Sequence, residues 1–246
     1  MEPPMHGTPG IRFVAINGSE RTGGNTADIL DYCSQLLAAR DASLEVVDVS
    51  TLDITPCGPC GDCLTRTTPC AVEDGVTAAV ERMTTADGII FAAPVHGFGT
   101  AGPMQAFIER AGVGHLRFQR PLTNKVGGVI VLGRRYSHTE VFSQLVLNVL
   151  LNRMIMIGSG FPAIVYGDRP GEARHDDEGL DMVSRMVDRM LDLAELLAEH
   201  RRLTGAEVLV PRDDTEWSSR LSVPGGRPDH AEHPDLPIPA AARAGR

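Results

Sequence analysis

The chain has 246 residues, 42% of them hydrophobic, and its 32 acidic side chains outnumber 23 basic ones to give a formal charge of −9. This length allows one large domain with its own core, or one domain with an appended segment. The negative charge argues against nucleic-acid binding, which requires a basic surface. Apolar runs stay short of the roughly 20 residues that cross a bilayer, and residues 1–10 do not resemble a signal peptide. We therefore expect a cytosolic protein with reduced thiols and with neither a nucleic-acid nor a membrane partner.

Short apolar runs alternate with amphipathic helical patterns along most of the chain. Five runs are predicted to be strands, at residues 11–16, 44–49, 88–93, 125–132 and 163–166. Helices are predicted around 29–37, after an Asp74 cap to about 85, from 103 to 110, over 139–154 and over 177–201. This alternation is typical of a parallel sheet that carries helices on both faces.

A polar loop, NGSERTGGNT at residues 17–26, joins the first predicted strand to the first helix. The free amides and the dipole at a helix N-terminus favour an anion. Ser19, Asn25 and Thr26 offer neutral donors, and Arg21 can form a forked pair with phosphate oxygens. The loop is neither a G-x-G-x-x-G turn nor a Walker A sequence. We therefore predict a monophosphate site, with an ordinary polar loop capped by Asn25 as the alternative.

Two loops that follow predicted strands resemble those of a known family. The pattern G-S-x-R-x-x-G-N-T is similar to the FMN phosphate loop of the flavodoxin-like NADPH-dependent FMN reductase superfamily. The segment IIFAAPVHGFGTAGPMQAFIER, residues 89–110, resembles its isoalloxazine loop, P-V-Y-x-G-x-x-S, and the following helix that ends in F-I-D-R. The resemblance covers residues 12–201. It implies a flavodoxin-like three-layer sandwich with a five-stranded parallel sheet, and FMN at the carboxyl ends of the strands.

The match has departures that bear on the flavin site. His96 stands where the family usually has Tyr, and Gln105 and Glu109 replace Lys and Asp. His96 is therefore a candidate catalytic residue, as a proton donor near the flavin, or a side chain that only satisfies a loop carbonyl.

A third loop, GRRYSHTE at residues 133–140, stands where relatives often have H-G-G-Q-E. Only Glu140 and the general position match, so Arg135 and Tyr136 are assigned either to the substrate side or to a solvated loop. The segment RHDDEG, residues 174–179, resembles the family's D-x-E-G start of the last helix, which is a structural feature. The predicted FMN-binding residues are Ser19, Arg21, Asn25, Thr26, Pro94, Val95, His96, Gly97, Phe98, Gly99, Gly133 and Arg134.

Four of the five cysteines fall in CGPCGDCLTRTTPC, with the spacing C-x2-C-x2-C-x6-C at Cys57, Cys60, Cys63 and Cys70. Thiolates are the soft ligands that iron-sulfur clusters require, and the first three match the run of bacterial ferredoxins. The segment resembles that of the iron-sulfur flavoprotein branch of the same superfamily, which implies a 4Fe-4S cluster in addition to FMN. Structural zinc, a thiol-disulfide pair and inert thiols are the alternatives. Cys33 lies on the apolar stripe of the first helix and is predicted to be buried.

From about residue 205 the chain becomes rich in Pro, Asp, His, Ala and Arg, with little apolar periodicity. Such a tail is either disordered or an arm that packs on a partner subunit, with Trp217 as its anchor. The predicted organisation is a flavodoxin-like domain over 1–204 with a cysteine insertion at 55–72, followed by an extended Pro-rich tail over 205–246.

The predicted function is that of a flavin-dependent oxidoreductase containing FMN and a 4Fe-4S cluster. Electrons would pass from a ferredoxin-like donor through the cluster to FMN and a small-molecule acceptor, with NAD(P)H as a further donor. The alternatives are a cluster-free NAD(P)H-dependent FMN or quinone reductase and a non-catalytic electron carrier. The resemblance also implies a homodimer or homotetramer, in which the cluster of one subunit can face the flavin of another.

Overall fold

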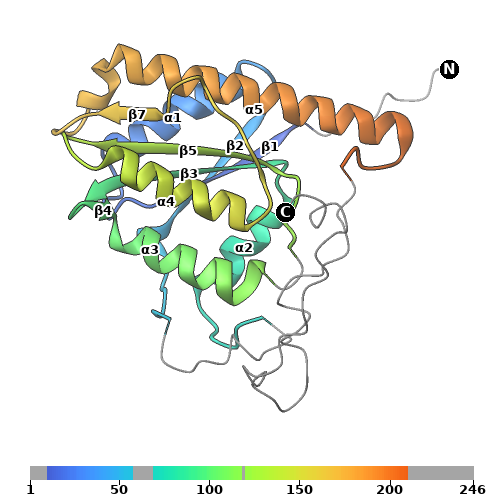
Figure 1. Cartoon of the computed structure of the whole chain (residues 1–246), viewed down its shortest axis with the longest axis horizontal. Helices are drawn as coiled ribbons and strands as arrows, with labels where there is room; N and C mark the ends of the chain where they lie inside the picture. Colours follow the sequence, from blue (N-terminus) through green and yellow to red (C-terminus); the bar gives the residue numbers. More distant parts are fainter. Residues whose placement is uncertain (1–9, 58–68, 118–119, 210–246) are drawn as a thin grey trace, which may run out of the picture.

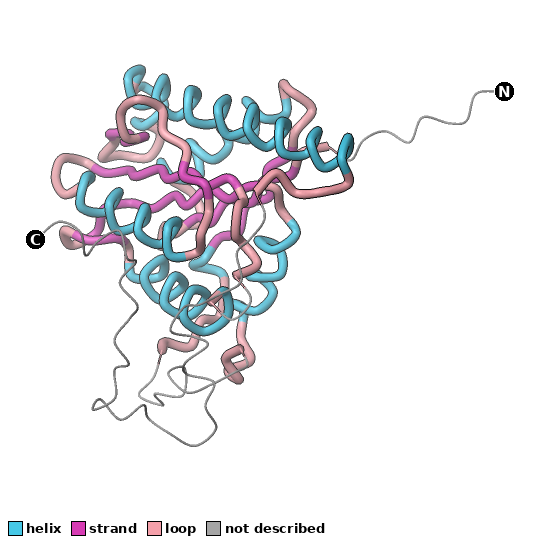
Figure 2. The backbone as a smooth tube through the Cα atoms, turned by 45° about the vertical axis from the view of Figure 1, so that its right-hand side comes forward, coloured by secondary structure: helices cyan, strands magenta, loops and turns pink. Residues whose placement is uncertain are grey.

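The computed structural model of the chain describes residues 10–57, 69–117 and 120–209. In these residues a sheet forms the middle layer between two layers of helices (Figure 1, Figure 2). Its strand order is β2-β1-β3-β5-β6, and these neighbours are all parallel. The order matches the doubly wound flavodoxin arrangement, so the predicted fold class is confirmed.

The fifth strand position is shared by two short strands, because β6 pairs with the beginning of β5 and β7 pairs with its end. In addition, β4 forms an antiparallel hairpin with the end of β3. The strands are β1 (Arg12–Asn17), β2 (Ser43–Asp48), β3 (Gly88–His96), β4 (Gly99–Thr100), β5 (Val126–Gly133), β6 (Ile155–Met156) and β7 (Ala163–Tyr166).

The alternation of side chains along a strand distributes the core between the two helix layers. In β1, Phe13 and Ala15 join the core under α1 (Asn25–Ala38) and α5 (Asp177–Thr204). Val14 and Ile16 join the core on the other face, under α2 (Gly75–Thr85), α3 (Gly102–Ile108) and α4 (His138–Leu151). Cys33 is 0% exposed in the first of these cores, as predicted. Among the described residues, no helix is long and apolar enough to cross a membrane.

Three predicted helix ends differ from the structure, and one of them is that of α5, which continues three residues beyond the predicted Arg201. The helix that was expected to end at Arg110 continues beyond α3 as a π-helical segment, η3 (Glu109–Leu116). Gly112 and Gly114 lie in it, and glycine has a low propensity for an α-helix, while π-helical turns are frequent at functional sites. The helix predicted over 139–154 is α4, and it ends at Leu151, three residues before the predicted end. Arg153, two residues later, adopts a left-handed φ of 57°.

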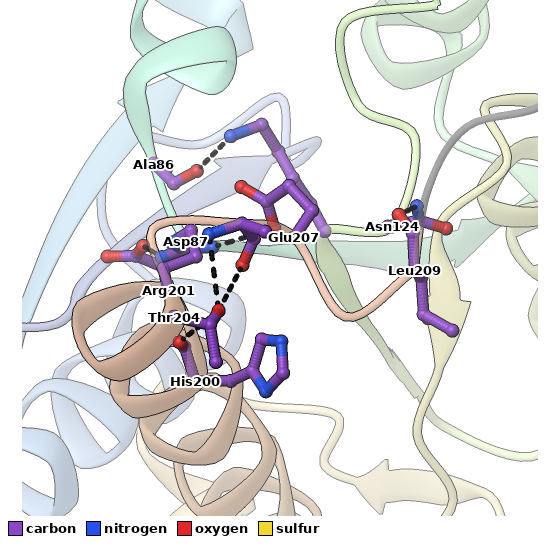
Figure 3. Close-up of polar contacts among 10 residues, drawn as sticks. Ala86, Asp87, Asn124, His200, Arg201, Thr204, Glu207 and Leu209 are labelled. Atoms are coloured by element: carbon purple, nitrogen blue, oxygen red, sulfur yellow. Dashed lines mark hydrogen bonds and ion pairs between the residues drawn. The ribbon is translucent and has the colours of Figure 1, made fainter.

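The predicted tail begins at a regular helix end. Gly205 has a φ of 69° and its N–H donates to the carbonyl of Arg201 at 2.9 Å, a glycine cap that closes α5. The chain then turns back toward the beginning of β5, where Asn124 Nδ2 donates to the carbonyl of Leu209 at 2.6 Å (Figure 3). Trp217 lies outside the described residues, so the arm stays a prediction.

Candidate functional site

A cleft opens where the loops after β1, β3, β5 and β7 meet. It contains about 790 Å³ of space between the protein atoms, part of which is open to solvent. This is the edge of an open α/β sheet where ligands bind. The lining residues are Ser19, Glu20, Arg21, Gly24, Asn25, Thr26, Pro94, Val95, His96, Ala101, Leu132, Gly133, Arg134, Gly167 and Asp168.

The first wall of the cleft is the polar loop that leads into α1. Buried Asn17 shapes it, since its Nδ2 donates to Asp48 Oδ1 at 2.6 Å and its Oδ1 accepts from the Ser19 amide at 3.1 Å. Ser19 Oγ in turn accepts from the Arg21 amide at 3.1 Å. Among the described residues the Arg21 guanidinium has no ion-pair partner, so its charge is available to a bound anion.

No side chain caps the N-terminus of α1. Asn25, the alternative cap, instead accepts a hydrogen bond from the Ala173 amide at 3.3 Å through Oδ1. Thr26 lies beside it and is 4% exposed. The first amides of α1 therefore remain available to an anion in the cleft, as the dipole of the helix favours.

The second wall is the hairpin between β3 and β4. His96 Nδ1 lies 3.2 Å from Glu20 Oε1, which connects this hairpin to the first wall. Gly97 and Phe98 both have a left-handed φ, 58° and 66°, as the central residues of a type I′ turn require. Such a backbone costs about 1–3 kcal/mol for a residue other than glycine. The turn nevertheless holds the Phe98 ring 74% exposed beside the cleft.

The third wall begins at Gly133, the last residue of β5. A Cβ at this position would lie 2.8 Å from His138 Nε2 and 3.3 Å from the Val95 side chain, so a larger residue would require these side chains to shift. Arg134 follows, with Nε 3.5 Å from Asp168 Oδ2 in the loop after β7. The exposed Arg134 side chain thus stands between the cleft and an adjoining hollow.

The structure brings most of the predicted flavin residues into this one cleft. Gly97 and Phe98 line the adjoining hollow instead, together with Arg135 and Tyr136, and Gly99 pairs with His96 in the hairpin. Sequence reasoning missed six lining residues. Gly167 and Asp168 directly follow the parallel strand β7, and this position is a signal that could have identified them. The missed residues are Glu20, Gly24, Ala101, Leu132, Gly167 and Asp168.

Two cysteines of the predicted ligand set lie in the described residues. Cys57 is exposed and Cys70 is half-buried, both as free thiols, and neither lines the cleft. Cys60 and Cys63 lie outside the described residues. Within the described ranges no group of three or more metal-ligating side chains is present, so the predicted ligand set stays a prediction.

A hydrogen-bonded group of Thr55, Asp74, Val76 and Arg110, which we call the stem, lies at the two ends of the cysteine segment. Asp74 is its centre, since Oδ1 accepts from the Val76 amide at 3.1 Å and caps α2 as predicted. Its Oδ2 accepts from the Thr55 amide at 3.0 Å and lies 2.6 Å from Arg110 Nη1. Arg110 Nη1 also donates to the Thr55 carbonyl. The stem therefore ties both ends of the cysteine segment to η3.

The ion pair at the centre of the stem is buried. The side chains of Asp74 and Arg110 are 2% and 3% exposed. Burial alone would raise the pKa of Asp74, but the Arg110 hydrogen bond and two backbone amides, at Thr55 and Val76, hold it below its ordinary value. Asp74 is therefore a carboxylate at neutral pH, and Arg110 compensates its charge.

The surroundings of Cys70 fit an iron-sulfur ligand. Its amide donates to the Gly114 carbonyl of η3 at 2.7 Å. Arg110 Nε and Nη2 and His115 Nε2 are buried and have no hydrogen-bond partner within the described part of the chain. Cluster sulfurs and thiolates accept hydrogen bonds, and the negative charge of a thiolate-ligated cluster is stabilised by nearby donors. By contrast, burial raises the pKa of the Cys33 thiol to about 12, which makes it inert.

A doubly wound parallel sheet with a polar loop before its first helix is the architecture of flavodoxin-like proteins. The chain belongs to the NADPH-dependent FMN reductase family, whose model matches residues 11–168. FMN is the flavin of this family, and the predicted family and enzyme class are confirmed.

Among similar proteins is an iron-sulfur flavoprotein from Methanocaldococcus jannaschii, 27% identical over 194 residues that span 76% of this chain and 99% of the relative. An iron-sulfur flavoprotein from Methanosarcina thermophila is 29% identical over 195 residues, which span 78% of this chain and 99% of that protein. The crystal structure of RosB with a bound intermediate has a TM-score of 0.61 at 18% identity, over 90% of this chain and 96% of that one. The likeness to RosB supports the fold alone.

Proposed function

We propose that the protein binds FMN in the cleft and a 4Fe-4S cluster on Cys57, Cys60, Cys63 and Cys70. It would pass electrons from a ferredoxin-like donor to a small-molecule acceptor. The observation that carries the proposal is the stem, in which the buried Asp74–Arg110 ion pair and the Thr55 amide connect the ends of the four-cysteine segment to the domain. The two archaeal relatives, both named iron-sulfur flavoproteins, support it.

When bound, FMN supplies one- and two-electron chemistry and the cluster supplies one-electron transfer. The domain contributes binding and orientation. The open N-terminus of α1, with the hydroxyls of Ser19 and Thr26, would hold the phosphate, and Arg21 would add a charge-assisted bond. The absence of a side chain at Gly133 would allow the ring system to approach the backbone.

His96 is the residue of the cleft best placed to move a proton. Its Nδ1 lies 3.2 Å from the Glu20 carboxylate, which can fix the ring and accept a proton in turn. A general acid or base must lie within hydrogen-bond reach of the reacting group, and the hairpin places His96 on the lining of the cleft. We assign His96 to proton transfer at the flavin edge, with Glu20 as the residue that orients it.

A homodimer or homotetramer would bring the two redox sites together. The family resemblance implies that the cysteine segment of one subunit faces the flavin of another, and Cys57 and Cys70 do not line the cleft of their own chain. The outer surface of α4 supports an oligomer, because Leu147, Leu150 and Leu151 are each at least half exposed.

The test is metal and flavin analysis of full-length protein prepared without oxygen. We expect about four irons and four sulfides for each FMN. Cys60→Ala should lose the iron, retain FMN and lose reduction of FMN by a one-electron donor. Cys33→Ala is the matched control, because this buried thiol belongs to the core, and it should retain both groups. Stoichiometric zinc without iron would overturn the proposal.

A second candidate is a cluster-free NAD(P)H-dependent FMN or quinone reductase, which the NADPH dependence of the family favours. Turnover of NADPH with a quinone or free flavin by Cys60→Ala, at the wild-type rate, would establish it. Reduction by ferredoxin in stoichiometric amount, without turnover of any small molecule, would instead indicate an electron carrier.

A further inference from the structure

The π-helical segment η3 carries two side chains with buried, unpartnered nitrogen atoms, Arg110 and His115, and it contacts the cysteine segment at Cys70. Arg110 and His115 are five residues apart and would point roughly 140° away from each other in an α-helix. In a π-helix, the i to i+5 hydrogen bonding brings such residues onto one side. The Cys70 amide donates to the Gly114 carbonyl, and a Cβ at Gly114 would lie 3.3 Å from Cys70 Cβ. Cys70 is therefore seated against this turn.

Only one of the three guanidinium nitrogens of Arg110, Nη1, has hydrogen-bond partners in the stem. Nη1 serves both the Asp74 carboxylate and the Thr55 carbonyl. Nε and Nη2 have no partner among the described residues, although the side chain is only 3% exposed. Because the guanidinium is planar and rigid, fixing Nη1 also fixes the directions of the other N–H groups. A buried donor without an acceptor is costly, which points to an acceptor that binds here.

Cys70 packs against η3, the segment that carries these donors. Its amide donates to the carbonyl of Gly114, four residues after Arg110, at 2.7 Å. Cys70 is also the fourth cysteine of the predicted ligand set.

We propose that Arg110 is a positioning residue that donates a hydrogen bond from Nε or Nη2 to the Cys70 sulfur when this thiolate ligates the cluster. The inference rests on the proposed function. A donor to a ligating sulfur stabilises the more negative, reduced state, so Arg110 raises the reduction potential of the cluster. The Asp74 carboxylate would orient this donor in the way that carboxylates orient metal-ligating histidines.

Arg110→Lys separates this role from a merely structural one. Lysine keeps the charge opposite Asp74 but loses the planar fork. We expect the variant to retain iron and FMN and its cluster potential to become more negative. The reduction equilibrium should shift about tenfold, which is about 59 mV for one electron. The FMN potential and the surface control Arg40→Lys, in the exposed group with Asp192 and Glu195, should not change. An iron-loaded Arg110→Lys with the wild-type cluster potential would overturn the inference.

A measurement on the unmutated chain decides the case in which Arg110→Lys does not hold iron. Protein grown with guanidino-¹⁵N arginine should show a ¹⁵N coupling to the reduced cluster in pulsed EPR spectra. The coupling should persist in Arg66→Lys, the control for the arginine within the cysteine segment. A cluster without this coupling overturns the inference alone. Wild-type protein without iron overturns the proposed function as well, so the two failures are distinguished by the metal analysis.

Discussion

The flavin cleft and the stem of the cysteine segment use charged side chains in opposite ways. In the cleft the charges are exposed or free, as in the exposed pair of Arg134 with Asp168 and in Arg21, which lacks an ion-pair partner among the described residues. In the stem the Asp74–Arg110 pair is almost completely buried. We therefore expect the sheet edge to fold without the charges of the cleft and the stem to depend on its buried pair. Charges of the cleft are thus available for ligands, and charges of the stem hold the fold.

Asp74→Ala gives the largest expected effect, because it leaves Arg110 buried without a counter-charge. Breaking a buried pair costs about 3–5 kcal/mol, and the lost cap of α2 adds about 1 kcal/mol. Urea unfolding of the cluster-free protein measures the change. Arg174→Ala, which removes an exposed pair with Asp28 at 2.9 Å, should leave the midpoint nearly unchanged. A loss in Asp74→Ala no larger than that of the control would contradict the comparison.

Arg21→Ala should leave stability intact and weaken FMN binding. A charge-assisted hydrogen bond contributes about 1.5–3 kcal/mol, which corresponds to a dissociation constant raised roughly 10- to 150-fold. Flavin fluorescence titration of the apoprotein measures it, and circular dichroism verifies the fold. Arg185→Ala, in a surface pair on α5, is the control. Unchanged FMN affinity in a folded Arg21→Ala protein would rule out the phosphate assignment.

Acid should reduce the contribution of the Asp74–Arg110 pair to the unfolding free energy. The pKa of Asp74 is lower in the folded protein than in the unfolded chain, so its contribution is fully present above the ordinary aspartate pKa of about 3.9. It is lost as the pH falls from there through the lower folded value. The unfolding free energy of the wild type should therefore fall more steeply below about pH 4 than that of Asp74→Asn. Parallel pH profiles would show that the pair does not contribute.

Truncation after Gly205 should have the smallest effect on the domain. It removes the Asn124–Leu209 hydrogen bond and the Arg201–Glu207 pair, at 3.6 Å, both in exposed positions, where a pair contributes at most about 1 kcal/mol. If the tail is an arm, the same truncation should loosen the oligomer in analytical ultracentrifugation. Rapid proteolysis of the tail with assembly unaffected would instead support disorder.

The positions of β1, β2, β3, β5 and β7, of most helices and of the two loops that identify the family can be predicted from the sequence. Hydrophobic periodicity is a local property, so β7 and the Asp74 cap of α2 follow from a few adjacent residues. The phosphate loop and the β3 to β4 hairpin are contiguous, so their chemistry is also legible in the sequence. Strands of two residues, such as β4 and β6, exist only through their partners and had no local signal.

The contacts between residues far apart in the chain follow from the tertiary fold and not from local sequence. Arg110 and Asp74 are 36 residues apart, and Asn25 and Ala173 are 148 apart. Their contacts depend on the order of the strands and on the π-helical continuation of α3, neither of which is encoded in local periodicity. Burial makes the Asp74–Arg110 contact important for stability, because a charge that is removed from water is costly unless an opposite charge pairs with it. For this reason the arginine at the end of F-I-E-R was only a motif position in the sequence, and became the centre of the cysteine stem in the structure.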